Sequence, residues 1–368
     1  MIKKTARDAD QVFAFGMPGR WRCCHRPMTE PGDKIATMQI HARTMSPRRL
    51  MHRFRPALPV AGFAGLPGFG FPGLGFPGFL PTLRAYSGLR VPQVRIPHAS
   101  ETLGRLGSLE VKLARTAADV RRAQRLRFQV FYQEMSAVAD APTMLARRDV
   151  DPFDPICDHV LVIDHNAAPR GPLRKPTVVG TYRMLRQDIA ERHDGFYSAS
   201  EFDIGALIRR HPGLNFLELG RSCVLPQYRN KRTVELLWHG IWTYVLANRL
   251  DVMIGCASLE GTDPDSLALP LSFLHHYARA PEEWRASAVP RRYVEMNRMP
   301  KSAINPKAAL HALPPLVKGY LRLGAFIGDG AVVDRQFGTT DVLMILPVSA
   351  IKGRYIEHFG ATAGRHAA

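Results

Sequence analysis

The sequence predicts an α/β or α+β domain over residues 105–368, built on one mixed sheet with helices on both faces. Runs with the two-residue alternation of β-strands come between segments with the three- and four-residue spacing of amphipathic helices, an order that gives a sheet covered by helices. Hydrophobic residues make up 46% of the 368 residues and charged residues 22%, so the chain can form a substantial core.

The first predicted elements are a strand, a helix and two paired strands. Residues 110–114 (EVKLA) alternate apolar and charged side chains, as in a strand with one buried face. Residues 116–135 repeat apolar side chains at helical spacing. Residues 159–164 (HVLVID) and 178–185 (VVGTYRML) are rich in apolar β-formers, and the Pro- and Gly-containing stretch between them predicts a hairpin with a long turn.

A strand, a helix and a second strand follow in close succession. We expect the strand at 215–225 (NFLELGRSCVL), the helix at 231–250 and the second strand at 251–258 (DVMIGCAS). The apolar face of the helix consists of Val234, Leu237, Trp238, Ile241, Val245 and Leu246.

One helix and one strand are predicted in the remaining part of the chain. Asp263 and Pro264 are residue types of a helix cap and a first helical position, so a helix is expected from there to about Arg279. Residues 342–346 are expected to form a late strand.

Basic charge is concentrated in the first hundred residues. The chain has 50 Lys and Arg against 32 Asp and Glu, a formal net charge of +18. Residues 1–100 contain 15 basic and 4 acidic side chains, which leaves +11 there and +7 on the remainder. Such an excess favours an anionic partner, either nucleic acid, a phospholipid surface or an acidic protein. Nucleic acid is the least favoured, because no nucleic-acid-binding motif is present.

Residues 1–104 are predicted to be a basic extension, rich in Gly, Pro and Phe, without a regular fold. Residues 61–82 contain seven Gly, four Pro and five Phe, and no residue between Pro56 and Leu83 is charged. Proline removes backbone donors, so this uncharged stretch is not expected to form a membrane-spanning helix. It is either an extension without function or a tether to a membrane surface or a partner. No apolar segment follows the first lysines, so a secretory signal is not expected.

The usual cofactor and metal motifs are absent from the sequence. It has no Gly-rich phosphate loop, dinucleotide fingerprint or nucleophile elbow. An odd number of Cys without a CxxC pair argues against a disulfide framework or zinc ribbon and indicates a reducing compartment. His275 and His276 lack the companions of a metal site and are interpreted as structural or solvated. We therefore expect neither a resident cofactor nor a metal.

Charged residues interrupt four otherwise apolar runs, and these runs are the strongest functional signal. They are Arg127 in LRFQVF, Asp151 and Asp154 in DVDPFD, Arg183 in GTYRML, and Glu218 and Arg221 in LELGRSCV. Alternation places Glu218 and Gly220 on one face of their strand and Arg221 on the other, unless a bulge occurs at Gly220. A charged group in a half-buried strand is costly unless it is paired, so one interpretation is a buried structural network and the other is a site.

These segments resemble the GNAT acyltransferases that take acyl groups from acyl carrier protein, and most of all the ornithine N-acyltransferases of ornithine-lipid synthesis. The match covers about residues 110–360 and continues through RTVELLWHGIW, MIGCASLEG and FGTTDVLMILP, whereas the first 105 residues have no counterpart. Acyl-homoserine-lactone synthases are more distant relatives. The resemblance implies a GNAT-like fold whose mixed central sheet splays apart between strands 215–225 and 251–258.

The resemblance implies that the splayed strands admit the pantetheine arm of the donor. A backbone N–H at Gly220 would stabilise the oxyanion, and Cys223 and Val224 would contact the donor. Cys223 and Cys256 lie near the implied cleft, so an acyl-cysteine intermediate is conceivable. Direct attack is usual in GNAT enzymes, and structural roles are therefore expected for both thiols.

The chain departs from acetyl-CoA enzymes at residues 227–233. Those enzymes have a Gly-containing loop that wraps a pyrophosphate, whereas this chain has QYRNKRT, without either Gly. The basic residues Arg229, Lys231 and Arg232 suit the single phosphodiester and acidic surface of a carrier protein. The alternative is that they are only the solvated start of a helix.

The acceptor implied by the resemblance is an amino acid, ornithine. Glu218 is the expected base, acting directly or through a water, because an α-amino group with a pKa of about 7.7–8.0 needs only a modest base. Arg183 or Arg221 is expected to pair with the acceptor's carboxylate.

The acidic loop has two interpretations. Asp151 and Asp154 either hold the cation of a diamino acid or fix Arg127 and Arg183 in place.

The resemblance thus implies an N-acyltransferase that moves a (3-hydroxy)fatty acyl group from acyl carrier protein to ornithine, giving lyso-ornithine lipid. It implies a cytoplasmic enzyme, and a peripheral contact with the inner membrane face is a further expectation. One alternative is an acyl-homoserine-lactone synthase, which would bind S-adenosylmethionine, and another is an acyltransferase for a different amino acid. A third is a non-catalytic basic protein that binds a membrane surface or nucleic acid.

Overall fold

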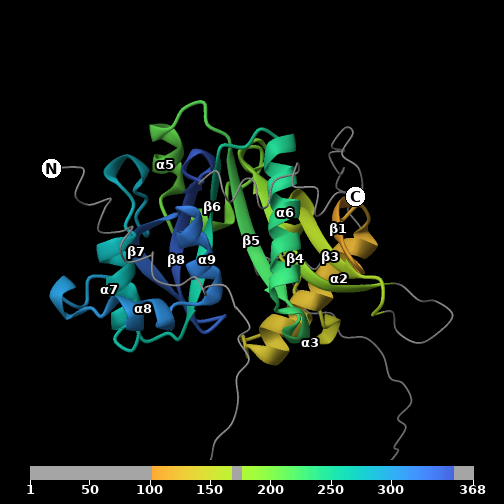
Figure 1. The fold of residues 1–368 in the computed structure, drawn as a ribbon, viewed down its shortest axis with the longest axis horizontal. Helices are drawn as coiled ribbons and strands as arrows, with labels where there is room; N and C mark the ends of the chain where they lie inside the picture. The colour runs from red at the N-terminus through yellow and green to blue at the C-terminus, as the bar shows by residue number, and fades with distance from the viewer. Residues whose placement is uncertain (1–101, 168–175, 352–368) are drawn as a thin grey trace, which may run out of the picture. The chain divides into compact units, whose positions relative to one another are not determined.

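The structure is a computed structural model that describes residues 102–167 and 176–351, and these form an eight-stranded sheet with helices packed on it (Figure 1). The strand order is β1-β2-β3-β4-β5-β6-β8-β7, and all neighbours are antiparallel except β5 and β6. The strands are β1 (Thr102–Leu106), β2 (Leu109–Leu113), β3 (Asp158–Asp164), β4 (Thr177–Arg186), β5 (Phe216–Val224), β6 (Val252–Glu260), β7 (Phe326–Asp334) and β8 (Thr339–Pro347). The extension predicted over 1–104 lies almost wholly outside the described residues.

All six predicted strands are confirmed, as β2, β3, β4, β5, β6 and β8, and β3 pairs with β4 in the expected antiparallel sense. The two edge strands, β1 and β7, were not predicted. Both have Gly inside the strand (TLGRL and FIGDGAVVD), which weakens the local pattern. Pairing with the neighbouring strand supplies the stability that their own residues do not indicate.

The helices are α2 (Ala117–Phe128), α3 (Ala141–Ala146), α4 (Gln187–Ala190), α5 (Ile204–Arg210), α6 (Lys231–Ala247), α7 (Ala268–Tyr277), α8 (Pro306–Ala312) and α9 (Pro315–Leu323). The Thr116 side chain caps α2 and the Asn230 side chain caps α6, each accepting a hydrogen bond from a backbone N–H of the first turn. The helix predicted over 116–135 is regular only to Phe128 and continues as a wider π-helical turn, η1 (Gln129–Glu134). No helix in the described ranges is long and apolar enough to cross a membrane.

The helix predicted to begin at Asp263 begins later. Asp263 accepts a hydrogen bond from the backbone N–H of Asp265 at 3.0 Å, and α7 starts at Ala268. The predicted cap at Asp263 was therefore wrong, because this side chain closes a local turn instead of the first turn of a helix.

α2 and α6 cover opposite faces of the sheet, which confirms the prediction of helices on both faces. On β4, a Cβ at Gly180 would lie 3.5 Å from Leu237 of α6. Arg183, three residues further along β4, shares Asp154 with Arg127 of α2. Successive side chains of a strand point to opposite faces, so the two contacts mark the two faces. Figure 1 shows α6 and α9 on the face turned to the viewer.

β5 and β6 separate after a short parallel pairing, which covers only the first three residues of β5, Phe216–Glu218. Gly255 lies where they part, since a Cβ there would lie 2.2 Å from the carbonyl oxygen of Leu219. Only glycine permits so close a backbone approach. Beyond this point the two strands are not paired with each other, which matches the splayed sheet that the resemblance implied.

A bulge interrupts β5 one residue after the expected position. Arg221 and Ser222 both lie opposite Tyr182 of β4, and Arg221 has a left-handed φ of 49°. Gly220, where the bulge was expected, stays in register with Arg183. The residue types favoured Gly220, but the tertiary contacts of the Arg221 side chain hold this residue in a conformation that arginine rarely adopts.

Candidate active site

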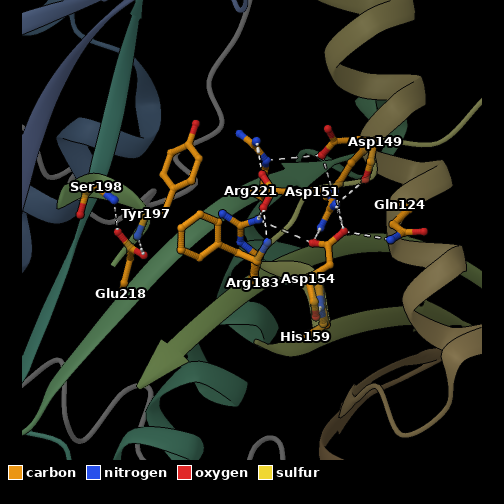
Figure 2. A network of polar contacts seen from close by, with 12 residues as sticks. Gln124, Asp149, Asp151, Asp154, His159, Arg183, Tyr197, Ser198, Glu218 and Arg221 are labelled. Atoms are coloured by element: carbon orange, nitrogen blue, oxygen red, sulfur yellow. Dashed lines mark hydrogen bonds and ion pairs between the residues drawn. The ribbon is translucent and has the colours of Figure 1, made fainter. Parts of the chain in front are cut away.

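Three arginines and three aspartates form one ionic network on the α2 face of the sheet (Figure 2). The arginines are Arg127 of α2, Arg183 of β4 and Arg221 of β5, and the aspartates are Asp149, Asp151 and Asp154 of the loop before β3. Their formal charges cancel, so the network ties the loop, helix and two strands together without a net charge.

Arg127 is fully buried and held by two aspartates. Its Nη1 and Nη2 donate to the Asp154 carboxylate at 2.9 and 2.7 Å, and its Nε lies 2.8 Å from Asp149 Oδ2. Burial raises the pKa of Asp154, but the ion pair with Arg127 outweighs it and holds the pKa below its ordinary value. The Arg127 side chain has no exposed surface. These contacts therefore match the second interpretation of the acidic loop, in which the loop fixes Arg127 in place.

Two neutral side chains complete the surroundings of Asp154. Gln124 Nε2 donates to Asp154 Oδ2 at 2.9 Å, and His159 Nε2 lies 3.1 Å from the backbone oxygen of Asp154. Burial lowers the pKa of His159, so its imidazole is neutral near pH 7.

Arg183 and Arg221 share Asp151 and stack on aromatic rings. Arg183 Nη1 lies 2.6 Å from Asp151 Oδ1, and Arg221 Nη2 lies 2.7 Å from Asp151 Oδ2. The Tyr197 ring centroid is 5.2 Å from the Arg183 guanidinium carbon and 5.1 Å from that of Arg221, and Phe337 lies 4.8 Å from Arg221. The side chain of Arg221 is 14% exposed against 4% for Arg183, so Arg221 is the more accessible to an acceptor carboxylate.

Glu218 holds the short helix η3 (Tyr197–Ser200) against β5. The backbone N–H groups of Tyr197 and Ser198 donate to its two carboxylate oxygens at 2.9 and 2.7 Å. These bonds place the Tyr197 ring against the arginines (Figure 2). Each carboxylate oxygen retains a further lone pair for a water or an amine, and the role of general base stays a prediction.

A pocket of about 40 Å³ lies where β5 and β6 separate. Gly220 and Arg221 of β5 form one side, and Gly255 and Cys256 of β6 form the other. Tyr320 of α9 also lines it. The facing strand edges are unpaired here, which suits an extended ligand with amide groups, as in strand addition to a sheet edge.

A second cluster, formed by Glu201, Cys256 and Asp341, lies beside this pocket. One oxygen or sulfur atom of each lies within 4.8 Å of the others, and Cys256 Sγ donates to Glu201 Oε2 at 3.2 Å. Burial raises the pKa of Asp341 to about 6 and raises that of Glu201. Burial and both carboxylates raise the pKa of the Cys256 thiol. A protonated thiol, and a Glu201 already paired with Arg292, make this cluster a poor metal site.

Sequence reasoning did not single out Glu201, Asp341 or Tyr197. Asp341 stands in the apolar run FGTTDVLMILP, so the signal that selected Glu218 also marks it. Glu201 and Tyr197 lie in short irregular segments without periodicity, and no comparable signal marks them.

Residues 126–239 match the family model described as acetyltransferase (GNAT) domain. The chain is 56% identical over 267 residues to the L-ornithine N(alpha)-acyltransferase of Rhizobium meliloti (strain 1021), covering 73% of this chain and 89% of that protein. It is 53% identical to the L-ornithine N(alpha)-acyltransferase of Brucella abortus (strain 2308), covering 76% of this chain and 99% of that protein. The chain belongs to the L-ornithine N(alpha)-acyltransferase family. The predicted GNAT-like fold and acyltransferase class are thereby confirmed.

Solved structures of low sequence identity are also similar to the chain. FeeM, an N-acyl amino acid synthase from uncultured soil microbes, aligns with a TM-score of 0.36 and 11% identity over 66% of this chain and 91% of that chain. The acyl-homoserine-lactone synthase LasI aligns with a TM-score of 0.36 and 12% identity over 67% of this chain and 95% of that chain.

The basic residues predicted to contact the acyl donor differ in how far their charges are paired with carboxylates of this chain. Arg229 forms a bidentate ion pair with Glu134, at 2.5 and 2.8 Å. Lys231 lies 3.4 Å from Glu235, yet 82% of its side chain is exposed, and Arg232 is exposed as well. Lys231 and Arg232 therefore remain accessible to a partner at the start of α6.

Cys223 and Val224 lie at the end of β5 and do not line the pocket. Burial raises the pKa of the Cys223 thiol to about 12. Because the thiolate is the nucleophile, Cys223 is a poor site for an acyl-enzyme at neutral pH, and the raised pKa of Cys256 disfavours that residue too. Donor contact at Cys223 and Val224 stays a prediction.

Proposed function

We propose that this chain transfers a 3-hydroxyacyl group from acyl carrier protein to the α-amino group of L-ornithine and so forms lyso-ornithine lipid. One observation carries the proposal: the 56% identity to an L-ornithine N(alpha)-acyltransferase over 89% of that protein's length. The splayed strands, the pocket between them and the accessible Arg221 support it. The phosphopantetheine arm belongs to a co-substrate, and no resident cofactor is proposed.

The donor enters between β5 and β6 in this proposal. Its amide groups pair with the unpaired strand edges, and a backbone N–H at the bulge that follows Gly220 donates to the thioester carbonyl oxygen. This N–H group is held in place by the bulge, and it stabilises the negative charge that the oxygen gains in the tetrahedral intermediate.

The acceptor amine attacks the thioester carbon from the α2 face. Arg221 pairs with the acceptor's carboxylate, and Glu218 takes the proton that the attacking nitrogen loses, directly or through a water. Collapse of the intermediate breaks the carbon–sulfur bond, and the departing pantetheine sulfur takes up a proton. The products are an amide and a free thiol, so no oxidant or metal is needed.

The carrier protein is proposed to dock at the start of α6. Lys231 and Arg232 are exposed there, and the Asn230 cap leaves the positive end of the α6 dipole facing the donor's phosphate. Because the product is an amphiphile, we place the reaction in the cytoplasm, beside the inner membrane face.

Mass spectrometry of products tests the proposed function. The purified full-length chain is incubated with 3-hydroxyacyl carrier protein and a panel of ornithine, lysine, glycine, glutamine and S-adenosylmethionine. We expect N-acylornithine as the main product and no product from acyl-CoA at the same concentration. An acyl-homoserine lactone, or another amino acid used in preference to ornithine, contradicts the proposal.

A further inference from the structure

The carboxylates of the site differ in the charge of their partners. Each aspartate of the ionic network has an oxygen within 2.8 Å of an arginine nitrogen. Glu218 instead accepts two backbone N–H bonds, one on each oxygen. The three aspartates are therefore neutralised by arginines, whereas Glu218 has only uncharged partners and is assigned to the reacting amine in the proposed function.

Glu201 and Asp341 have a surplus of buried negative charge. They are 3% and 7% exposed. Within the described ranges one cation contacts the pair: Arg292 Nη2 lies 3.1 Å from Glu201 Oε1, and the Arg292 side chain is 37% exposed. No described cation lies within 4 Å of Asp341, whose Oδ1 accepts a hydrogen bond from the Thr339 hydroxyl at 2.9 Å. Two ionised, buried carboxylates against one partly exposed cation are costly, and either a proton or a further cation relieves that cost.

The pair lies beside the space that Arg221 lines. Cys256, which donates to Glu201, lines the pocket together with Arg221. Asp341 of β8 lies opposite Ser258 of β6, two residues beyond Cys256 and therefore on the same face of the strand. Tyr197, on whose ring Arg221 stacks, begins the short helix η3 that ends next to Glu201, so the Arg221 guanidinium lies near the anionic pair.

We propose that Glu201 and Asp341 bind the side-chain ammonium of a diamino acid acceptor while Arg221 faces its carboxylate. The inference rests on the proposed function, in which the acceptor is ornithine, an amino acid with an ammonium group at the end of its side chain. An ammonium has three N–H donors and each carboxylate has free acceptor positions, so binding satisfies both and neutralises the buried charge.

The titration of the pair is consistent with this role. Burial first, and then the charge of Glu201, raise the pKa of Asp341 to about 6, and the charge of Asp334 acts in the same direction. Hydrogen bonds from Thr339 and Ser258 oppose the shift. The carboxyl group of Asp341 is therefore ionised at pH 7.5 and ready to accept a cation.

A comparison of two acceptors tests the inference. Norvaline has the ornithine backbone without the terminal amine, so the ratio of kcat/KM for ornithine to that for norvaline isolates the ammonium contact. We expect Asp341→Asn and Glu201→Gln in the full chain each to lower this ratio at least tenfold, with kcat/KM for norvaline within threefold of the unaltered chain. Glu260→Gln, an exposed carboxylate on the same strand as Cys256, is the matched control and should leave the ratio unchanged.

An unchanged ratio in both variants overturns the inference. Equal loss with both acceptors also overturns it, because the pair then serves something that ornithine and norvaline share. Calorimetric measurement of ornithine binding in the absence of the acyl donor distinguishes failure of this inference from failure of the proposed function. If the unaltered chain binds ornithine but acylates nothing, a tenfold weaker Kd in both variants still supports the ammonium site, and an unchanged Kd overturns it.

Discussion

At the scale of single residues, the site uses arginine where a planar group with several donors is required. Arg127 spans Asp149 and Asp154, and Arg183 and Arg221 reach one carboxylate while lying against the Tyr197 ring. Lysine offers one charged point and stacks less well, so it cannot make both kinds of contact at once.

Glu218 is expected to act on turnover more than on acceptor binding. Glu218→Gln removes the base and also places an amide N–H opposite one of the two backbone N–H donors. We expect kcat to fall by about 100-fold or more, with KM for ornithine changed less than about threefold. Steady-state kinetics from pH 6 to 9 measure this, with thermal unfolding as the check on folding. Turnover equal to that of the unaltered chain at every pH removes Glu218 as the base.

Acceptor preference should depend on pH through Asp341. Its pKa of about 6 means that the carboxyl group becomes neutral as the pH falls through 6 and then no longer attracts an ammonium. The ornithine to norvaline ratio should therefore fall between pH 7.5 and 5.5, while titration of the α-amine affects both acceptors alike. In Asp341→Asn the ratio should be flat over this range. A pH-dependent ratio in that variant assigns the effect to another group.

At the scale of elements, the fold holds the acidic loop against α2 through a buried ion pair. Arg127→Leu removes the nearest cation of Asp149 and Asp154 and leaves them only the longer contacts with Arg221 and Arg183, at 3.4 and 3.6 Å. Loss of a buried partner is costlier than removal of a surface charge. We expect the free energy of unfolding in urea to fall by about 3–5 kcal/mol. Arg121→Leu, an exposed position on the same helix, is the control and should change it by less than about 0.5 kcal/mol. Equal effects at the two positions would falsify the buried-pair account.

The separation of β5 and β6 depends on Gly255. A methyl group there would lie 2.2 Å from the Leu219 carbonyl oxygen, so Gly255→Ala must push apart the strands that form the pocket. We expect a loss of about 1–3 kcal/mol in stability and of most activity. Gly319→Ala in α9, where no atom lies within 4 Å of the new methyl, should be neutral or more stable by up to about 1 kcal/mol. Retained stability in Gly255→Ala contradicts the close approach.

At the scale of the whole molecule, charge is divided between two parts of the chain. The first hundred residues have +11 and the remainder +7. Removing residues 1–101 should therefore leave acyl transfer in place but weaken binding to anionic lipid vesicles, most clearly at low salt. Sedimentation with phosphatidylglycerol vesicles, with neutral vesicles as the control, measures this. Equal vesicle binding with and without residues 1–101 refutes the tether interpretation.

Local pattern was sufficient to predict the six inner strands and the long helices, because burial of one face imposes a period that residue types record. It was insufficient at the edges and irregularities. β1 and β7 contain glycines, the start of α7 is displaced by an Asp turn, and the bulge lies at Arg221 instead of Gly220. In each case a contact distant in sequence, or a competing local hydrogen bond, outweighs the preference of the residue itself.

The sequence by itself determined the family, the positions of the inner strands along the chain and the charged residues that interrupt apolar runs. Only the tertiary structure decided what those charges do, because the cost of a buried charge depends on which partner lies within a few ångströms of it. It showed that Asp149, Asp151 and Asp154 are neutralised by arginines, whereas Glu201 and Asp341 come together from segments 140 residues apart and have one partly exposed described cation, which contacts Glu201. Folding brings such groups together, and no local pattern records that proximity.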